Sequence, residues 1–309
     1  MTLQPDPTSA APPDAFRAAP PHPFDRLTAR MTLLAAALGA LPGMLLVWFW
    51  RGHFSSAWTI GGFVIYGMCA LAVIAYARSR GVGIARLFGP RPTAGGLALA
   101  VGLAVAVLAF SLGTLLSILA LIALANPAIL DKVREGAPGF VVRSRGHVDL
   151  VSTLARGATV ALCAPLVEEL LFRGLVFTRW GRRFGIRRGL LFSALLFGLL
   201  HISLQPLGAF VLGLVAGLLY LRTRSLWVAI AAHATNNLIV VFATSWGEQA
   251  VAHAAPLPEG SELRGLLAFG VVLFLVSTPV VVLALRRLWP AGDAVLPYDA
   301  PGPAPAPTP

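Results

Sequence analysis

Hydrophobic residues gather along this chain into long runs, which short links rich in Arg, Pro or Gly separate. Several runs have the roughly 20 residues that cross a bilayer as a helix. The pattern therefore predicts an all-α integral membrane protein, a bundle of about eight transmembrane helices. The predicted spans are residues 32–50, 57–77, 94–125, 152–178, 189–203, 207–221, 226–244 and 265–285.

The two ends of the chain lack this pattern. Residues 1–31 are rich in Pro and Ala and do not show the order of parts of a signal peptide, so they predict a disordered cytoplasmic tail. Residues 290–309 form a second Pro/Ala-rich tail. The sequence thus divides into these tails and one polytopic membrane domain over residues 32–289.

Composition supports the membrane interpretation. The chain of 309 residues is 57% hydrophobic and 12% charged, whereas soluble domains are about 45–50% apolar and about 25% charged. The two cysteines, Cys69 and Cys163, lie inside apolar runs and are expected to pack as small hydrophobic residues. A disulfide framework is not implied.

The net charge of +11 comes almost wholly from Arg clusters between the apolar runs. Such clusters are typical of the cytoplasmic loops of membrane proteins, and they are not interleaved with aromatic residues as in nucleic-acid binders. Alternation through eight spans predicts that both termini are cytoplasmic. The link 126–151, with four basic residues on the predicted outer side, is the exception. The predicted partner is the lipid bilayer, with no nucleic acid.

Few ionisable residues lie within the spans, and a charged side chain at the bilayer centre costs roughly 2.5–3.5 kcal/mol on insertion scales. At 1.5 Å per residue, Glu168, His201 and His233 lie roughly 15, 18 and 10 Å from the inner ends of their spans. Three helices therefore place these side chains at a similar depth, which predicts one site near the middle of the membrane.

Helical spacing sorts the polar residues into pairs. Glu169 and Arg173 are four apart and share a face, so they can neutralise each other. Glu168 points about 100° away and needs a partner from another helix, for which His201 is the candidate.

The third predicted pair comes from one later span. His233 and Asn237 are four apart and project together. A carboxylate with an imidazole can deprotonate water, and a His with an Asn can stabilise an oxyanion. These are the parts of an amide-hydrolysing site. Glu168, His201 and His233 could also bind a divalent metal such as zinc with one position left open.

Three motifs resemble those of the CAAX protease and bacteriocin-processing family, also called CPBP or Abi. EELLFR (168–173) is similar to its EExxxR motif, FGLLH (197–201) to FxxxH, and HATNN (233–237) to HxxxN/D. They occur in the order of the family, on separate spans. The resemblance covers about residues 150–245.

The resemblance implies an intramembrane endopeptidase that cleaves a membrane-associated protein or peptide. Glu168 would activate water with the help of His201, and His233 and Asn237 would form the oxyanion hole. Glu169 and Arg173 would brace the helix, and Phe197 would pack beside the site. The family is often labelled as metalloproteases, yet a metal-free glutamate mechanism has also been argued for it, and both use these residues.

Two other functions stay open at this stage. A non-proteolytic scaffold or bacteriocin-immunity protein would keep the fold without turnover. A proton-coupled transporter would use intramembrane Glu and His as relays, but the inverted repeats and broken helices of many transporters are not seen in the sequence. The Arg-, Ala- and Pro-rich composition is typical of a GC-rich bacterium, so the expected location is the inner membrane and prenylated substrates are not expected.

Overall fold

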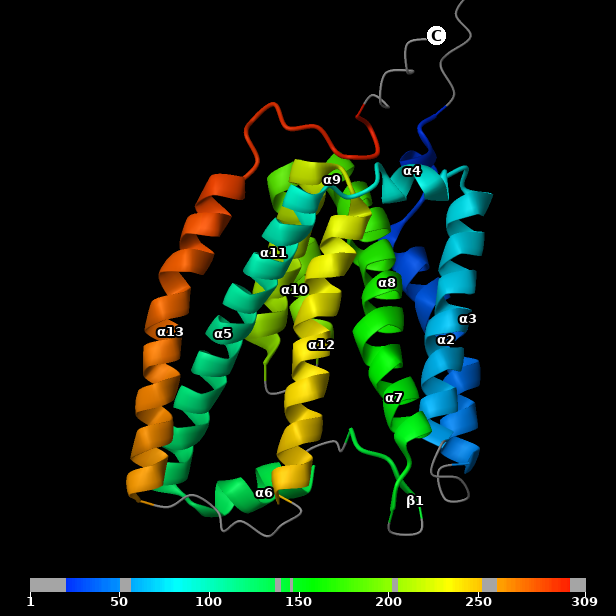
Figure 1. Cartoon of the computed structure of the whole chain (residues 1–309). Helices are drawn as coiled ribbons and strands as arrows, with labels where there is room; N and C mark the ends of the chain where they lie inside the picture. Colours follow the sequence, from blue (N-terminus) through cyan, green and yellow to red (C-terminus); the bar gives the residue numbers. More distant parts are fainter. Residues whose placement is uncertain are drawn as a thin grey trace, which may run out of the picture.

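The computed structural model describes residues 21–50, 57–136, 140–144, 147–201, 205–251 and 260–300. Its long helices stand side by side in one upright bundle (Figure 1). A two-residue antiparallel strand pair joins Arg143–Ser144 to His147–Val148 in the described part. The elements are α1 Pro23–Arg26, α2 Ala29–Trp50, α3 Ala57–Ser79, α4 Ile84–Phe88, α5 Ala94–Ala125, α6 Ala128–Gly136, β1 Arg143–Ser144, β2 His147–Val148, α7 Leu150–Ala158, η1 Thr159–Cys163, α8 Ala164–Glu169, η2 Leu170–Phe177, α9 Thr178–Phe184, α10 Ile186–Leu200, α11 Pro206–Thr223, α12 Leu226–Val251 and α13 Ser261–Leu288.

The prediction of an all-helical membrane bundle is confirmed, whereas the count of eight spans is not. Within the described residues, six helices are long and apolar enough to cross a bilayer: α2, α3, α5, α11, α12 and α13. The predicted span 152–178 falls in a run that is helical from Leu150 to Phe184 but changes between α and π geometry. The span predicted at 189–203 corresponds to α10, which has 15 residues and is followed by residues outside the described part. The lower end of α10 stops well above the level of α6 and β1 (Figure 1).

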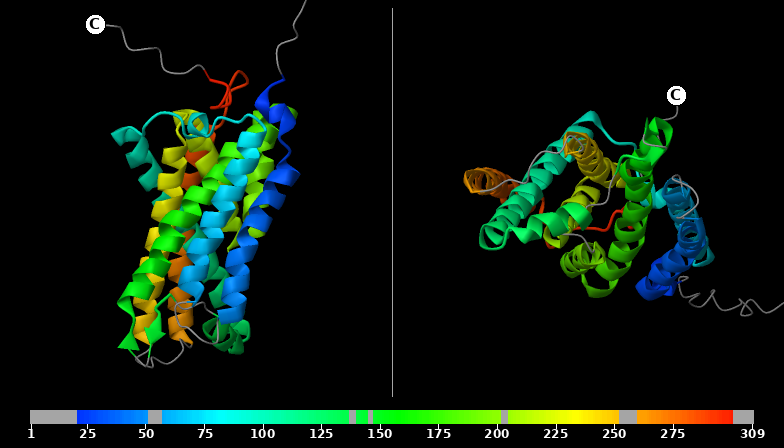
Figure 2. Two further views of the ribbon diagram at one scale, coloured as in Figure 1. Left: turned by 90° about the vertical axis from the view of Figure 1, so that its right-hand side faces the viewer. Right: turned by 90° about the horizontal axis from the view of Figure 1, so that it is seen from below.

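The outer helices present apolar side chains to their surroundings. Trp48 of α2 is 58% exposed, Leu121 of α5 56% and Val276 of α13 67%. Such a surface suits lipid chains. The α2–α3 pair and α13 lie at opposite edges of the bundle, with the other long helices between them (Figure 2). Every residue of η2 is buried, so Arg173 lies in the interior of the bundle, and Glu169 at the end of α8 is buried as well.

Glycines allow α5 and α13 to pack backbone to backbone. A Cβ added at Gly113 would lie 2.5 Å from the backbone nitrogen of Phe274 and 2.9 Å from the carbonyl oxygen of Gly270. Both are backbone atoms, which cannot move aside as a flexible side chain could. Close approach of this kind is how membrane helices associate without a hydrophobic driving force.

We therefore expect Gly113→Val to destabilise the bundle by about 1–3 kcal/mol, the usual cost of overpacking. Gly102 lies on the same helix, but a Cβ there would meet nothing within 4 Å, so Gly102→Val is the matched control. Thermal unfolding in detergent should show a lower melting temperature for the first variant only. Equal melting temperatures would show that α5 and α13 do not pack this closely.

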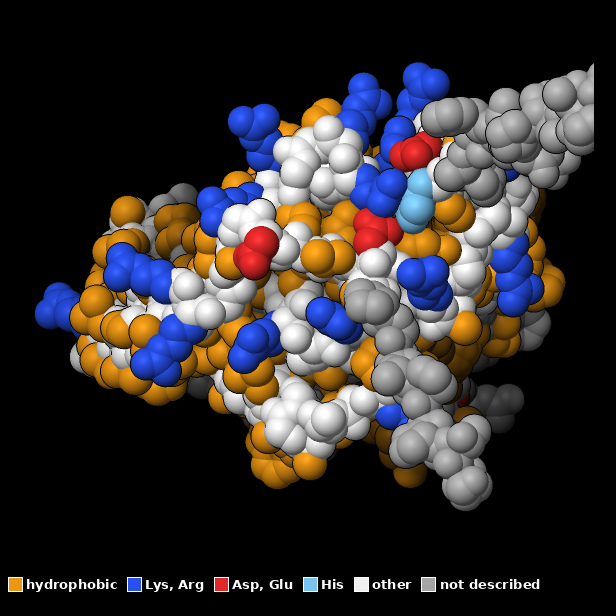
Figure 3. Space-filling model, turned by 90° about the horizontal axis from the view of Figure 1, so that it is seen from above, with side chains coloured by type: hydrophobic (Ala, Val, Ile, Leu, Met, Phe, Trp, Pro, Cys, Tyr) orange, Lys and Arg blue, Asp and Glu red, His pale blue; other side chains and the backbone are white. Residues whose placement is uncertain are grey.

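Both chain ends lie on one face, which carries α4, α9 and many Arg side chains (Figures 1 and 3). Phe24 and Tyr298 are buried there, and their rings meet edge to face with centroids 4.9 Å apart. Asp299 accepts a hydrogen bond of 2.7 Å from Arg182 of α9. The described chain ends thus pack against α9, at the end of the helical run that carries the Glu pair.

These contacts correct the prediction of a disordered N-terminal tail at residues 21–31, and they also involve the predicted C-terminal tail. Residues 21–31 and 290–300 are ordered, and α1 lies within the predicted N-terminal tail. The Pro-rich composition gave no sign of the buried aromatic residues, because single aromatic residues have no periodic pattern. Residues 1–20 and 301–309, the rest of the two predicted tails, lie outside the described residues.

Candidate active site

The Glu pair sits on α8, a six-residue α-helical segment between the π-helical segments η1 and η2. In η1 the N–H of Ala164 reaches the carbonyl oxygen of Thr159, five residues back. The same register would place Pro165 opposite Val160, but Pro has no N–H to donate. Asn237 of α12 supplies the missing donor, because its Nδ2 lies 3.0 Å from the carbonyl oxygen of Val160. A side chain from another helix therefore stabilises the irregular backbone just before the site.

The start of this helical run lies at the opposite face from the chain ends. Asp149 caps α7, because its Oδ1 accepts a 3.0 Å bond from the backbone N–H of Ser152 and its Oδ2 a 2.7 Å bond from the hydroxyl of the same residue. These hydrogen bonds, the backbone one first, hold the pKa of the Asp149 carboxyl below its usual value. A charged acceptor at a helix N-terminus is favourable, so the helix begins at a fixed residue.

The predicted Glu169–Arg173 ion pair is present and fully buried. The Nη1 atom of Arg173 lies 2.9 Å from Oε1 of Glu169, and the two side chains are 2% and 0% exposed. The Nδ1 atom of His233 lies 2.8 Å from the same Glu169 oxygen. Glu169 thus binds an imidazole as well as the guanidinium, so it connects α12 to the helix of the Glu pair.

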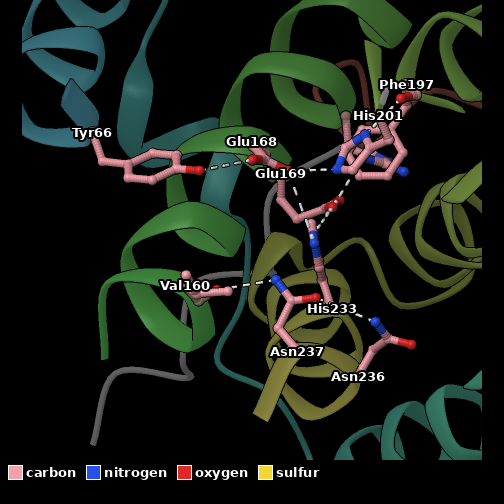
Figure 4. Close-up of polar contacts among 10 residues, drawn as sticks. Tyr66, Val160, Glu168, Glu169, Phe197, His201, His233, Asn236 and Asn237 are labelled. Atoms are coloured by element: carbon pink, nitrogen blue, oxygen red, sulfur yellow. Dashed lines mark hydrogen bonds and ion pairs between the residues drawn. The ribbon is translucent and has the colours of Figure 1, made fainter. Parts of the chain in front are cut away.

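Glu168 meets three side chains from three other parts of the chain (Figure 4). The hydroxyl of Tyr66 donates to its Oε1 at 3.4 Å. Its Oε2 faces Nε2 of His201 at 3.7 Å and Nε2 of His233 at 3.9 Å. The prediction that Glu168 needs an interhelical partner and finds His201 is confirmed at this geometry. The contacts with His233 and Tyr66 were not predicted.

Hydrogen bonds fix the tautomers of the two imidazoles. The Nδ1 atom of His201 lies 2.7 Å from the carbonyl oxygen of Phe197, and that of His233 faces the Glu169 carboxylate. Both acceptors require a proton on Nδ1. Each Nε2 atom then carries a lone pair when its ring is neutral and a proton when its ring is an imidazolium.

Phe197 packs against the charged groups as the sequence predicts. Its ring is buried, with its centroid 4.3 Å from that of His201 and 5.5 Å from that of His233. The guanidinium carbon of Arg173 lies 4.4 Å from the same centroid. A cation over an aromatic face is attracted to the ring quadrupole. Phe197 therefore packs against both imidazoles and the guanidinium at once.

The predicted pair of His233 and Asn237 is held in place by other residues. In the described contacts, His233 binds Glu169, while Asn237 donates to Val160 and its Oδ1 accepts from Asn236 at 3.2 Å. The two residues do share one side of α12, and Figure 4 shows both beside the helix of the Glu pair. The bond to Val160 uses one of the two N–H groups of the Asn237 amide, and the other is left for a further acceptor.

The donor set does not form a metal site at the present side-chain positions. Ligands bound at 2.0–2.1 Å in a tetrahedral site lie about 3.3 Å apart, whereas Oε2 of Glu168 is 3.7 and 3.9 Å from the two Nε2 atoms. Among the residues that the structure describes, no group of three or more His, Cys, Asp or Glu side chains is arranged to hold a metal ion. The residues therefore do not fit the predicted metal as they stand.

Comparison with known proteins points to the same segment. Residues 150–239 match the family model described as "Type II CAAX prenyl endopeptidase Rce1-like". The protein "Putative membrane peptidase YdiL" of Bacillus subtilis (strain 168) is 32% identical over 82 residues, which are 26% of this chain and 34% of the relative. The chain thus spans about a third of the length of the curated relative that it matches. No solved structure matches this chain.

The matched residues 150–239 contain the Glu pair, both imidazoles and Asn237. The family that the three sequence motifs resemble is the one that the comparison finds. This segment of the chain is therefore similar to the CAAX-protease family.

Proposed function

We propose that this protein is an intramembrane endopeptidase that hydrolyses a peptide bond in a membrane-associated protein or peptide. The observation that carries the proposal is the convergence of Glu168 and the two imidazoles of His201 and His233 from three helical segments. Glu168 is 20% exposed and His201 34% exposed, whereas His233 is 3% exposed. A substrate can therefore approach from the side of Glu168 and His201, with His233 behind them.

Glu168 and His201 would activate the attacking water. Oε2 of Glu168 has no hydrogen-bond partner among the described residues, and the free Nε2 of His201 faces it. Between these two acceptors, a water can donate both of its O–H groups. One O–H bond breaks as its proton passes to Glu168, and the hydroxide oxygen forms a bond to the carbonyl carbon. When the C–N bond breaks, Glu168 returns the proton to the amine that leaves.

His233 and Asn237 would stabilise the negative oxygen of the tetrahedral intermediate. To donate from Nε2, His233 must be an imidazolium, since its Nδ1 already donates to Glu169. The remaining N–H of Asn237 adds a second donor. Preorganised donors of this kind contribute strongly to acyl transfer. The Glu169–Arg173 pair would then act by holding His233.

The surroundings of the site suggest where the substrate lies. The apolar outer faces of the bundle indicate a substrate that reaches the site from the bilayer, such as a membrane-tethered protein or a hydrophobic peptide. We infer that the Arg-rich face with both chain ends is cytoplasmic, since basic residues accumulate on that side. The inner membrane of a bacterium remains the proposed location.

The proposal is tested by comparing new N-termini in membranes from cells with the wild-type protein and cells with the Glu168→Gln variant. Peptides that appear only with the wild type identify substrates and cleavage sites. A purified protein that then cleaves the same sequence in lipid nanodiscs supports the proposal. If neither experiment shows a cleavage that depends on Glu168, the protein acts as a scaffold or immunity factor instead.

We expect cleavage to survive the removal of metal ions, because the donor atoms of Glu168, His201 and His233 lie too far apart for tetrahedral coordination. The measurement is cleavage of an identified substrate after dialysis against a strong chelator, with metal content determined by mass spectrometry. Loss of activity that zinc restores would contradict this expectation and assign the metal to these three residues. A soluble zinc peptidase in the same chelator confirms that metal was removed.

A further inference from the structure

Tyr66 brings a hydroxyl to Glu168 from outside the segment that matches the family. The matched segment begins at residue 150, whereas Tyr66 lies on α3. Its hydroxyl is 3.4 Å from Oε1 of Glu168, and Figure 4 shows its ring pointing from α3 straight toward that carboxylate. The motifs of the sequence gave no signal for this residue, because the contact joins positions 102 residues apart.

Contacts along one face of α3 hold Tyr66 in this place. Residues 59, 62 and 66 are three and four apart, so they share a helix face. The hydroxyl of Thr59 lies 3.4 Å from the carbonyl oxygen of Ser152, and a Cβ added at Gly62 would lie 3.0 Å from the side chain of Thr159. This face of α3 therefore packs along the helical run that leads to Glu168. Tyr66 is the residue of this face that contacts Glu168.

We propose that Tyr66 is a positioning residue for Glu168. A carboxylate has two oxygens, and a donor on Oε1 leaves Oε2 turned toward His201 and His233. This inference rests on the proposed function and adds a residue from a different part of the chain to it.

Other groups also act on the charge of Glu168. It faces Cys69 on α3 as well as Tyr66, His201 at the end of α10 and His233 on α12. Arg173 of its own helix interacts with it electrostatically. Since Tyr66 is the neutral donor of this group, its hydroxyl can be removed without changing the net charge of the site.

The test compares Tyr66→Phe with Tyr76→Phe in the full-length protein, using a substrate that the wild type cleaves. Tyr76 is on the same helix, and its hydroxyl accepts from the backbone N–H of Thr28 instead. We expect Tyr66→Phe to lower kcat roughly tenfold, the effect of losing one hydrogen bond to a charged group. KM should stay unchanged. Tyr76→Phe should change none of these.

Two controls keep the outcome clear. Melting temperatures in detergent show whether either variant is unfolded. If Tyr66→Phe does not fold, a fluorinated tyrosine at position 66, which is a stronger donor of similar shape, should change kcat while KM stays unchanged. A kcat of Tyr66→Phe equal to that of Tyr76→Phe overturns the inference while Glu168→Gln remains inactive. If Glu168→Gln is as active as the wild type, the proposed function itself is wrong.

Discussion

Replacing Glu168 by Gln should lower cleavage about 10²- to 10⁴-fold, the usual contribution of a general base. The amide keeps the shape of the side chain and can still accept from Tyr66, whose hydroxyl lies 3.4 Å from Oε1. It cannot take a proton from water at neutral pH. The fall should appear in kcat, because the substrate can still bind. The measurement is the steady-state rate on an identified substrate in nanodiscs.

The fold should survive this change, so the loss can be assigned to chemistry. Glu168 is 20% exposed and makes no ion pair with Arg173 in the described contacts, unlike its neighbour Glu169. Melting temperature and membrane level should therefore match the wild type. Glu262→Gln, in the first turn of α13, is the matched control and should cleave normally. Undiminished cleavage by Glu168→Gln would rule out the proposed role.

Replacing Arg173 by Ala should cost about 3–5 kcal/mol of stability, the penalty for breaking a buried ion pair. Arg173 is 1% exposed, so its removal leaves the carboxylate of Glu169 in a low-dielectric interior with the imidazole of His233 as its partner. Its packing against Phe197 is lost as well. Thermal unfolding in detergent should show a large drop in melting temperature, whereas Arg188→Ala, on the exposed start of α10, should show little change.

A double variant separates stability from activity at this pair. Replacing both charges, as in Glu169→Leu with Arg173→Met, removes the unpaired charge and should restore much of the stability. Cleavage should stay low, because the Nδ1 atom of His233 loses the acceptor that lies 2.8 Å away. A stable double variant with normal cleavage would show that the pair serves the fold alone.

The sequence predicted the parts of the site better than their connections. Periodicity placed Glu169 with Arg173, and the agreement in depth brought Glu168 and His201 together, since both signals are local or geometric. The partner of His233 could not be found this way, because an interhelical contact depends on how far each helix is rotated. The contact between Tyr66 and Glu168 could not be predicted for the same reason, because a single Tyr on an apolar helix forms no periodic pattern.

In the fold, too, the features that depend on local sequence were predicted, and those that depend on residues far apart in the sequence were not. The length of the apolar runs identified the long spans, but it could not show that the helix of the Glu pair alternates between α and π geometry. That irregularity depends on Pro165 together with Asn237, which are far apart in the sequence. The ordered chain ends were missed because single anchors such as Phe24 and Tyr298 carry no repeating pattern.

The π-helical segments make chain length, as well as residue identity, a condition of this site. A π turn pairs residues five apart, whereas an α turn pairs residues four apart, so η1 accommodates one extra residue. Deleting one residue from Thr159–Cys163 would let the helix close into regular α geometry, and the residues that follow would keep about the same direction. The wide turn whose Val160 carbonyl oxygen accepts from Asn237 would be lost. Deleting one residue from the regular helix α7 would instead turn Glu168 by about 100° away from its imidazoles, with every motif residue still present.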